Sequence, residues 1–233
     1  MASFRKEILG QIERIDTGRI FTFRDLSFET EKTANVAVLL SEQSRKGVLV
    51  RVEKGAYYRP KKSVLGLGKL PVYLDDQFRY LTEKPNGYIT GAYIYNKMGL
   101  TEQVATTITI ATPNPVRRFR FKNLDIECVK AYCMVYPDES LVPYLRLLDA
   151  IKDMKRIPGT TGQDIYNRVK SQYFNGYSLP ELEKIVSLAK SYPPRVRKVV
   201  ADILGDIRQT VLQTEMAKTI LPTTRFNLDY KTA

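Results

Sequence analysis

Apolar residues recur at helical spacing along the first fifteen residues of the chain. In "SFRKEILGQIERI", Phe4, Ile8, Ile12 and Ile15 are separated by charged residues. Positions three or four apart lie on one face of a helix. The spacing therefore predicts an amphipathic helix over residues 3–15, ended by the turn residues that follow it.

Two further helices are predicted before the first long basic stretch. Thr22 with Asp25 three residues later resembles a capping box, so a short helix is expected near residues 23–27. A longer helix is expected over residues 32–44, because the apolar positions in "NVAVLL" can pack against the first two helices. Gly47 lies just beyond its end.

After Gly47 the apolar period changes from 3.6 residues to two. The alternation in "GVLVRVE" places Val48, Val50 and Val52 on one face of a strand. A Lys-Gly turn then leads into a second strand, which Pro60 ends. This pattern predicts a hairpin whose valine side is packed and whose other side faces solvent.

Three helices followed by a hairpin are the layout of a winged helix-turn-helix, in which the third helix enters the major groove of DNA. We therefore expect an α+β protein with a winged helix-turn-helix domain at residues 1–62 and a mixed α/β domain at residues 72–233. The stretch "SVLGLGKLP" predicts a linker at residues 63–71. The second domain is expected to be β-rich over residues 104–136 and helical over residues 140–220, with "YITGAYIYNKMGLT" as an earlier short helix.

The distribution of charge indicates a partner. The 233-residue chain holds 37 basic and 25 acidic residues, and its net charge of +12 favours nucleic acid first and a membrane surface second. Residues 45–62 contain seven basic residues and one acidic residue, Glu53. The net charge of this segment is therefore half of the net charge of the whole chain. The alternatives are phosphate contacts along a hairpin, or a solvated hairpin whose edge lysines discourage strand pairing between molecules. The seven basic residues are Arg45, Lys46, Arg51, Lys54, Arg59, Lys61 and Lys62.

The start of the predicted third helix offers candidates for base contacts. Lys32, Thr33 and Asn35 lie there, and the Asn35 amide suits the edge of an adenine. Glu42 lies further along the helix and would repel phosphates.

A second basic strip is predicted in the β-rich part. In "RRFRFK" the alternation places Arg118, Arg120 and Lys122 on one face of a strand, opposite two phenylalanines. The alternative is an ordinary half-buried strand with a solvated basic side.

Composition excludes several classes of enzyme. The chain has no histidine, which excludes Ser-His-Asp and Cys-His catalysis, and two cysteines are too few for a Cys-only zinc site. The odd spacing of Cys128 and Cys133 disfavours a disulfide on a strand, so reduced cysteines are expected. "LDIECVK" loosely resembles a metal-dependent nuclease core, but Lys130 would point away from Asp125 and Glu127. We expect no enzymatic activity, no metal and no cofactor.

Targeting segments are not expected either. No window approaches about eighteen uninterrupted apolar residues, and the first fifteen residues carry charge throughout. We therefore expect a cytoplasmic protein that does not bind a membrane.

Several stretches together resemble the AbiEi-like antitoxins of bacterial type IV toxin–antitoxin (abortive-infection) systems. They are "GYITGAYIYNKMGLTEQV", "YPPRVRKVVADILG", "LPTTRFNLDY" and the hairpin "KGAYYRPK". The resemblance spans nearly the whole chain. It implies a winged-helix repressor that binds the operator of its own operon, joined to a C-terminal antitoxin domain. The paired toxin in that family is a nucleotidyltransferase, which the antitoxin opposes without a stable complex.

The resemblance also assigns residues to roles. Those that it maps onto the wing are Lys54, Tyr57, Arg59 and Lys61. Those that it maps onto the recognition helix are Thr33, Asn35 and Ser41. Relatives often carry more basic residues late in that helix, where this chain has Glu42 and Gln43.

The leading hypothesis is a DNA-binding transcriptional autorepressor and antitoxin without enzymatic activity, whose partner is double-stranded DNA. The alternative is a stand-alone winged-helix regulator whose C-terminal half dimerises or senses a ligand. A nucleic-acid-processing enzyme is a third hypothesis, which the missing histidine and the position of Lys130 disfavour.

Overall fold

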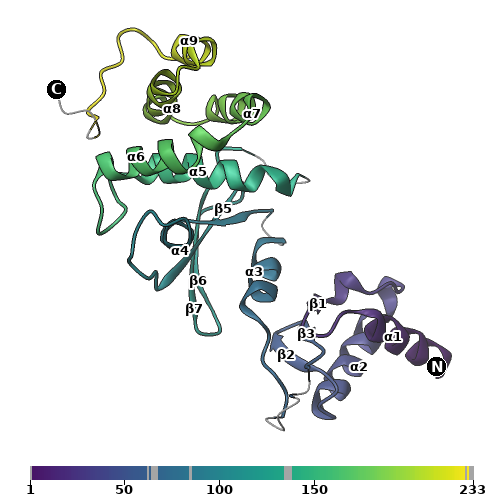
Figure 1. The fold of residues 1–233 in the computed structure, drawn as a ribbon. Helices are drawn as coiled ribbons and strands as arrows, with labels where there is room; N and C mark the ends of the chain where they lie inside the picture. The colour runs from purple at the N-terminus through teal and green to yellow at the C-terminus, as the bar shows by residue number, and fades with distance from the viewer. Residues whose placement is uncertain are drawn as a thin grey trace. The chain divides into compact units, whose positions relative to one another are not determined.

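The protein is a mixed α+β chain that divides into two compact units, Met1–Lys84 and Pro85–Ala233. The computed structural model describes residues 2–61, 63, 68–83, 86–133, 138–228 and 230 (Figure 1). Each unit has a hydrophobic core of its own. Within the described residues, no helix is both long and apolar enough to cross a bilayer.

As far as its residues are described, the first unit consists of three α-helices and one small sheet. Its elements are α1 (Ala2–Arg14), β1 (Ile20–Thr22), the 3-10 turns η1 (Phe23–Asp25) and η2 (Thr30–Lys32), α2 (Thr33–Arg45), β2 (Val50–Glu53), β3 (Ala56–Tyr58) and α3 (Leu74–Glu83). The sheet has the order β1-β3-β2, and both pairings are antiparallel.

The helices predicted at residues 3–15 and 32–44 are confirmed, each within one residue, as α1 and α2. They form because each has one apolar side, and these sides meet in the core of the unit together with Phe21 and Leu49. The helix predicted at residues 23–27 is only the 3-10 turn η1. Its capping box is present, but three residues are too few to bury an apolar stripe.

The hairpin is partly as predicted. Val50 and Val52 are half-buried and alternate with two exposed side chains, but Val48 is 52% exposed and lies outside β2. The reason is the exit from α2, where the backbone N–H groups of Val48 and Leu49 donate to the carbonyl oxygen of Gln43 at 3.0 and 3.2 Å. These bonds hold Leu49 in the core at 1% exposure, so the two-residue period begins later than expected.

The division between the units lies after the linker predicted at residues 63–71. The described residues near its two ends lie close together, because Leu70 N–H donates to the carbonyl of Lys61 at 2.8 Å. Helix α3 follows it and packs against β1, and the Tyr80 hydroxyl donates to Glu53 Oε1 at 2.5 Å. The second compact unit therefore begins at Pro85, whereas the predicted second domain begins at residue 72.

The second unit is a four-stranded sheet covered by helices. Its elements are β4 (Tyr88–Thr90), α4 (Ala92–Lys97), β5 (Thr107–Thr112), β6 (Arg118–Phe121), β7 (Leu124–Lys130), α5 (Val142–Asp153), α6 (Gly162–Gln172), α7 (Leu179–Ala189), α8 (Pro194–Asp206) and α9 (Thr210–Lys218), with 3-10 turns η3 (Glu139–Leu141) and η4 (Phe174–Gly176). The sheet order is β4-β5-β7-β6, with β5 and β7 parallel and the other pairs antiparallel. In Figure 1, α5 and α6 lie between the sheet and the layer of α7, α8 and α9.

This arrangement agrees with the β-rich and helical parts expected at residues 104–136 and 140–220, as far as residues are described. One helix prediction is wrong, because the "YIT" of "YITGAYIYNKMGLT" forms β4 and pairs with β5. Gly91 has φ 74° and separates the strand from α4. A Cβ at Gly91 would lie 2.6 Å from Thr109 Oγ1, so this close approach requires glycine.

A buried carboxylate joins the sheet to the helices of the second unit. Asp149 on α5 is 1% exposed and accepts hydrogen bonds from the hydroxyls of Tyr88 and Thr90, both at 2.8 Å, and of Tyr192 at 3.2 Å. Lys152 Nζ lies 3.2 Å from its Oδ1. Burial raises the pKa of the Asp149 carboxyl, and Lys152, Thr90 and Tyr88 oppose the shift.

Tyr230 belongs to the same core. Tyr230 is 2% exposed, stacks on Tyr166 with ring centroids 4.5 Å apart, and donates its hydroxyl to Asp202 Oδ2 at 2.9 Å. Tyr230, the last residue of the stretch "LPTTRFNLDY", thus packs against α6 and α8.

Removal of α3 tests where the first unit ends. The fragment 1–84 is expected to unfold cooperatively, and the fragment 1–71 to be less stable by about 1–3 kcal/mol, because β1 loses its helical cover and Glu53 loses the Tyr80 hydroxyl. Urea denaturation followed by circular dichroism measures both. Equal midpoints would contradict the assignment of α3 to this unit.

Asp149→Ala is expected to lower the free energy of unfolding of the second unit by about 3–5 kcal/mol, because three hydroxyls and the Lys152 ammonium lose a buried acceptor. Glu183→Ala removes an exposed carboxylate from α7 of the same unit and is the matched control, with a change within about 0.5 kcal/mol. Chemical denaturation of the full chain measures both variants, and similar losses would disprove the role of Asp149.

Candidate nucleic-acid interface

Helix α2 presents one side to solvent and buries the other. Its buried side chains are Val36, Leu39, Leu40 and Gln43. On the opposite side Ala34, Val38, Ser41 and Arg45 follow one another at steps of four, three and four residues, so they form one stripe. Three of these four are exposed and Ser41 is half-buried. We call this set the α2 outer stripe.

The residues predicted for base contacts differ in how accessible they are. Asn35 is exposed beside the α2 outer stripe. Thr33 is exposed as well, but its hydroxyl donates to the carbonyl of Thr30 at 2.5 Å and secures the start of the helix. The Lys32 amine lies 2.7 Å from Glu29 Oε2 and over the Phe4 ring, so it already has partners within the unit.

Glu42 is less repulsive to phosphate than the sequence indicates. Arg5 on α1 donates a hydrogen bond to Glu42 Oε2, and this bond holds the pKa of the Glu42 carboxyl below its usual range. The carboxylate is therefore paired with a cation of the same unit. Gln43, the next residue, is 8% exposed and belongs to the buried side of α2.

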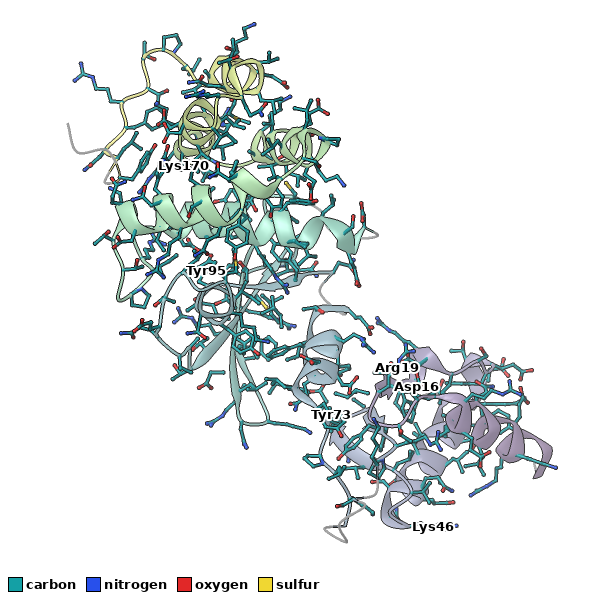
Figure 2. All side chains as sticks on the ribbon, viewed as in Figure 1. Asp16, Arg19, Lys46, Tyr73, Tyr95 and Lys170 are labelled. Atoms are coloured by element: carbon teal, nitrogen blue, oxygen red, sulfur yellow. The ribbon has the colours of Figure 1, made fainter. Side chains whose placement is uncertain are left out.

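Cations collect around the C-terminal end of α2 and the hairpin. Arg45 and Lys46 are exposed at the end of the helix, and Lys54 is exposed in the turn between β2 and β3. Lys46 lies at the edge of the unit, beyond the last turn of α2 (Figure 2). Arg51 is exposed, and its Nε donates to the carbonyl of Glu53 at 3.2 Å.

Lys69 is a member of this cluster that the sequence did not indicate. It lies in the segment predicted to be a linker, but its Nζ is so close to Gly47 that a Cβ at that position would clash with it. Lys69 therefore lies at Gly47, the residue that directly follows Arg45 and Lys46 in the chain. Among the described residues, no hydrogen bond or ion pair is made by the side chains of Arg45, Lys46, Lys54 or Lys69.

Two residues predicted on the wing belong to the fold instead. Tyr57 is 5% exposed and packs with its ring centroid 6.4 Å from that of Phe21, because β3 is the central strand and this side of it faces the core. Arg59 Nη1 donates to the carbonyls of Glu13 and Ile15 at 2.7 and 2.8 Å. These carbonyls end α1 and have no partner within the helix.

The remaining wing residues are Lys61 and Lys62. The Lys61 amine lies 5.2 Å from the centroid of the Tyr73 ring, and its side chain is exposed. Lys62 lies outside the described residues.

The second basic strip is neutralised across strands. Arg118 lies opposite Glu127 and Arg120 opposite Asp125 in the β6–β7 register, with closest separations of 2.6 and 3.7 Å. The sequence alternation is correct, but the facing strand supplies a carboxylate for each arginine. Lys122 occupies the turn at φ 52°, where burial lowers the pKa of its amine.

The same ion pairs involve the two carboxylates of the nuclease-like stretch "LDIECVK". Asp125 and Glu127 are ion-paired to arginines, and Lys130 is exposed at the end of β7. Within the described part of the chain, no group of three or more acidic or cysteine side chains is arranged to hold a metal ion. Cys128 and Cys133 are both free thiols, and burial raises the pKa of Cys133.

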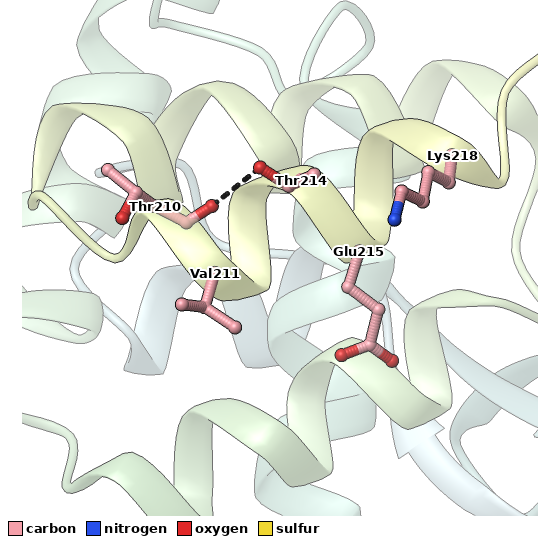
Figure 3. A pocket seen from close by; sticks show the side chains of 5 residues that line it. All are labelled: Thr210, Val211, Thr214, Glu215 and Lys218. Atoms are coloured by element: carbon pink, nitrogen blue, oxygen red, sulfur yellow. Dashed lines mark hydrogen bonds between the residues drawn. The ribbon is translucent and has the colours of Figure 1, made fainter.

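A shallow hollow on the second unit is lined by α9 residues Thr210, Val211, Thr214, Glu215 and Lys218 (Figure 3). The Thr214 hydroxyl donates to the Thr210 carbonyl at 2.8 Å, as is common in a helix. Its single carboxylate and single amine do not form a catalytic arrangement.

No protein-family model and no curated protein matches the chain. Among solved structures, it is similar to the RV2827C protein from Mycobacterium tuberculosis, with 13% sequence identity and a TM-score of 0.41. The match covers 95% of this chain and 83% of that one. A likeness at this level says nothing about function.

Substitution of Arg59 tests whether its side chain stabilises the fold or is available for DNA contact. Arg59→Ala is expected to lower the free energy of unfolding of the first unit by about 1–3 kcal/mol, because two carbonyls at the end of α1 lose a charged donor. Lys54→Ala, which also removes one cation from the hairpin, should change it by less than about 0.5 kcal/mol. Thermal and urea unfolding measure both, and a neutral Arg59→Ala would return Arg59 to the candidates for DNA contact.

Proposed function

We propose that the first unit is a winged-helix module that binds double-stranded DNA, with α2 as its recognition helix. The observation that carries this proposal is the exposed outer stripe of α2, flanked by exposed cations that make no hydrogen bond or ion pair within the described residues. Phosphate groups are the natural counterions for such a set, and a helix is the element that fits the major groove.

The topology supports the same proposal. A helix, a strand, a short helical turn, a second helix and a hairpin follow in the order of a winged helix, and the first strand pairs with the last strand of the hairpin. The middle helix of that layout is reduced to the turns η1 and η2. The hairpin carries Lys54 at its tip, where it would lie along the DNA backbone.

We further propose that the chain is a non-enzymatic autorepressor and antitoxin that opposes a nucleotidyltransferase toxin. This part rests on the resemblance to AbiEi-like antitoxins in the stretches quoted above. A nucleotidyltransferase gene beside this one, whose toxicity is relieved by co-expression of the chain, supports it. Binding to its own upstream DNA without such a neighbour would favour the stand-alone regulator.

The phosphate contacts are tested by salt dependence. The triple variant Lys46→Ala, Lys54→Ala and Lys69→Ala should bind the DNA upstream of its own gene and random duplexes less tightly, and by a similar factor. The slope of log K against log salt should fall by about 0.9 for each phosphate that the variant no longer neutralises. Gel shifts over a salt titration measure both quantities.

The matched control is Lys130→Ala, Lys155→Ala and Lys218→Ala, which removes the same charge from exposed positions of the second unit. It should leave the slope unchanged. Equal slopes for the wild type and the first triple variant would contradict the proposed interface.

A further inference from the structure

The middle of the α2 outer stripe is apolar. Val38 is 56% exposed, Ala34 precedes it by one helical turn, and Ala37 and Ser41 lie beside it. A single exposed valine is common on protein surfaces. Here, however, its neighbours along the stripe, Ala34 and Ser41, have side chains of two heavy atoms or fewer, and the longer Asn35 and Glu42 lie beside the stripe. Nothing on the stripe itself therefore screens Val38 from a partner until Arg45.

Neither packing nor helix propensity accounts for valine at position 38. The core contacts of α2 are made by Val36, Leu39 and Leu40 on the opposite side. A β-branched residue is a weaker helix former than alanine or leucine, because its side chain loses rotamer freedom in a helix. Helix stability therefore does not explain the valine at this exposed position.

The charge around the α2 outer stripe indicates which class of partner binds there. Arg45, Lys46 and Lys69 lie at the end of the stripe, and Lys54 lies in the hairpin turn, so a polyanion fits this side of the unit. An exposed apolar side chain with cations at the end of its stripe suits a partner that has apolar groups between rows of negative charge. The major groove of DNA has this chemistry, because the C5-methyl group of thymine is the apolar group on its floor and phosphates line both edges.

We propose that Val38 is a specificity-determining residue that contacts thymine methyl groups, with Ala34 allowing the helix to approach closely. This inference rests on the proposed DNA-binding function and adds a sequence preference to it. Asn35, exposed one position after Ala34, has an amide that matches the major-groove edge of adenine, so thymine-containing base pairs suit both side chains.

The test uses the full-length protein and defined DNA. Duplexes are selected from a pool of randomised duplexes about 20 base pairs long, roughly two turns of the DNA helix. The most enriched duplex is resynthesised with each thymine replaced in turn by deoxyuridine. Removal of a buried methyl group is expected to weaken binding about fourfold at the contacted position, by the transfer free energy of one such group. Fluorescence anisotropy measures the dissociation constants.

Val38→Ala identifies the residue that makes the contact. Because Val38 is exposed, the variant should fold as the wild type does, which circular dichroism checks. It should bind thymine and uracil duplexes equally at the contacted position while its salt dependence stays unchanged. Val211→Ala, the same substitution at a valine of α9 that is 79% exposed, should keep the wild-type preference for thymine.

The outcomes separate the inference from the function on which it rests. A thymine preference that Val38→Ala abolishes and Val211→Ala retains supports the inference. DNA binding without sequence enrichment, without an effect of uracil, or with a uracil effect that persists in Val38→Ala overturns the inference and leaves DNA binding intact. No binding to any duplex overturns the proposed function and the inference with it.

Discussion

The burial of one side of α2 against α1 decides what the first unit can present to a partner. Val36, Leu39 and Leu40 meet Ile8 and Ile12 in a closed core, and this packing fixes the rotation of the helix about its axis. The residues on the opposite side of α2 are then exposed whether they are polar or apolar. The accessibility of Asn35 and Val38, and therefore the proposed reading of DNA, depends on this arrangement.

The hydrogen bonds and ion pairs that basic side chains make within the protein determine which of them remain available to contact phosphate. The number of basic residues does not. Arg59 secures the end of α1, and the arginines of β6 face carboxylates on β7. The side chains of the cations at the end of α2 and at the hairpin tip make no hydrogen bond or ion pair within the described residues, although Arg45 and Lys46 lie near enough to Glu42 to lower the pKa of its carboxyl. Exposed ion pairs contribute little to stability, but they remove charge from a surface that would otherwise attract phosphate.

The second unit is organised by buried polar groups. Asp149 links the sheet to the helices through three hydroxyls and Lys152, and Asp202 holds Tyr230 near the end of the chain. Such groups are costly to bury unless each is satisfied, so they specify one arrangement of the helices over the sheet. This architecture gives the unit a defined structure without assigning it a chemical activity.

The sequence by itself determined the elements whose signal is local. The periods of 3.6 and two residues predicted α1, α2, the hairpin and the helical half of the second unit, and the absence of histidine removed whole classes of catalysis. Tertiary structure alone decided where Lys69 lies, that Tyr57 and Arg59 serve the fold, that α3 belongs to the first unit and that "YIT" is a strand. The physical reason is that these outcomes depend on contacts between residues far apart in the chain, which override local propensity and which a pattern of neighbours does not encode.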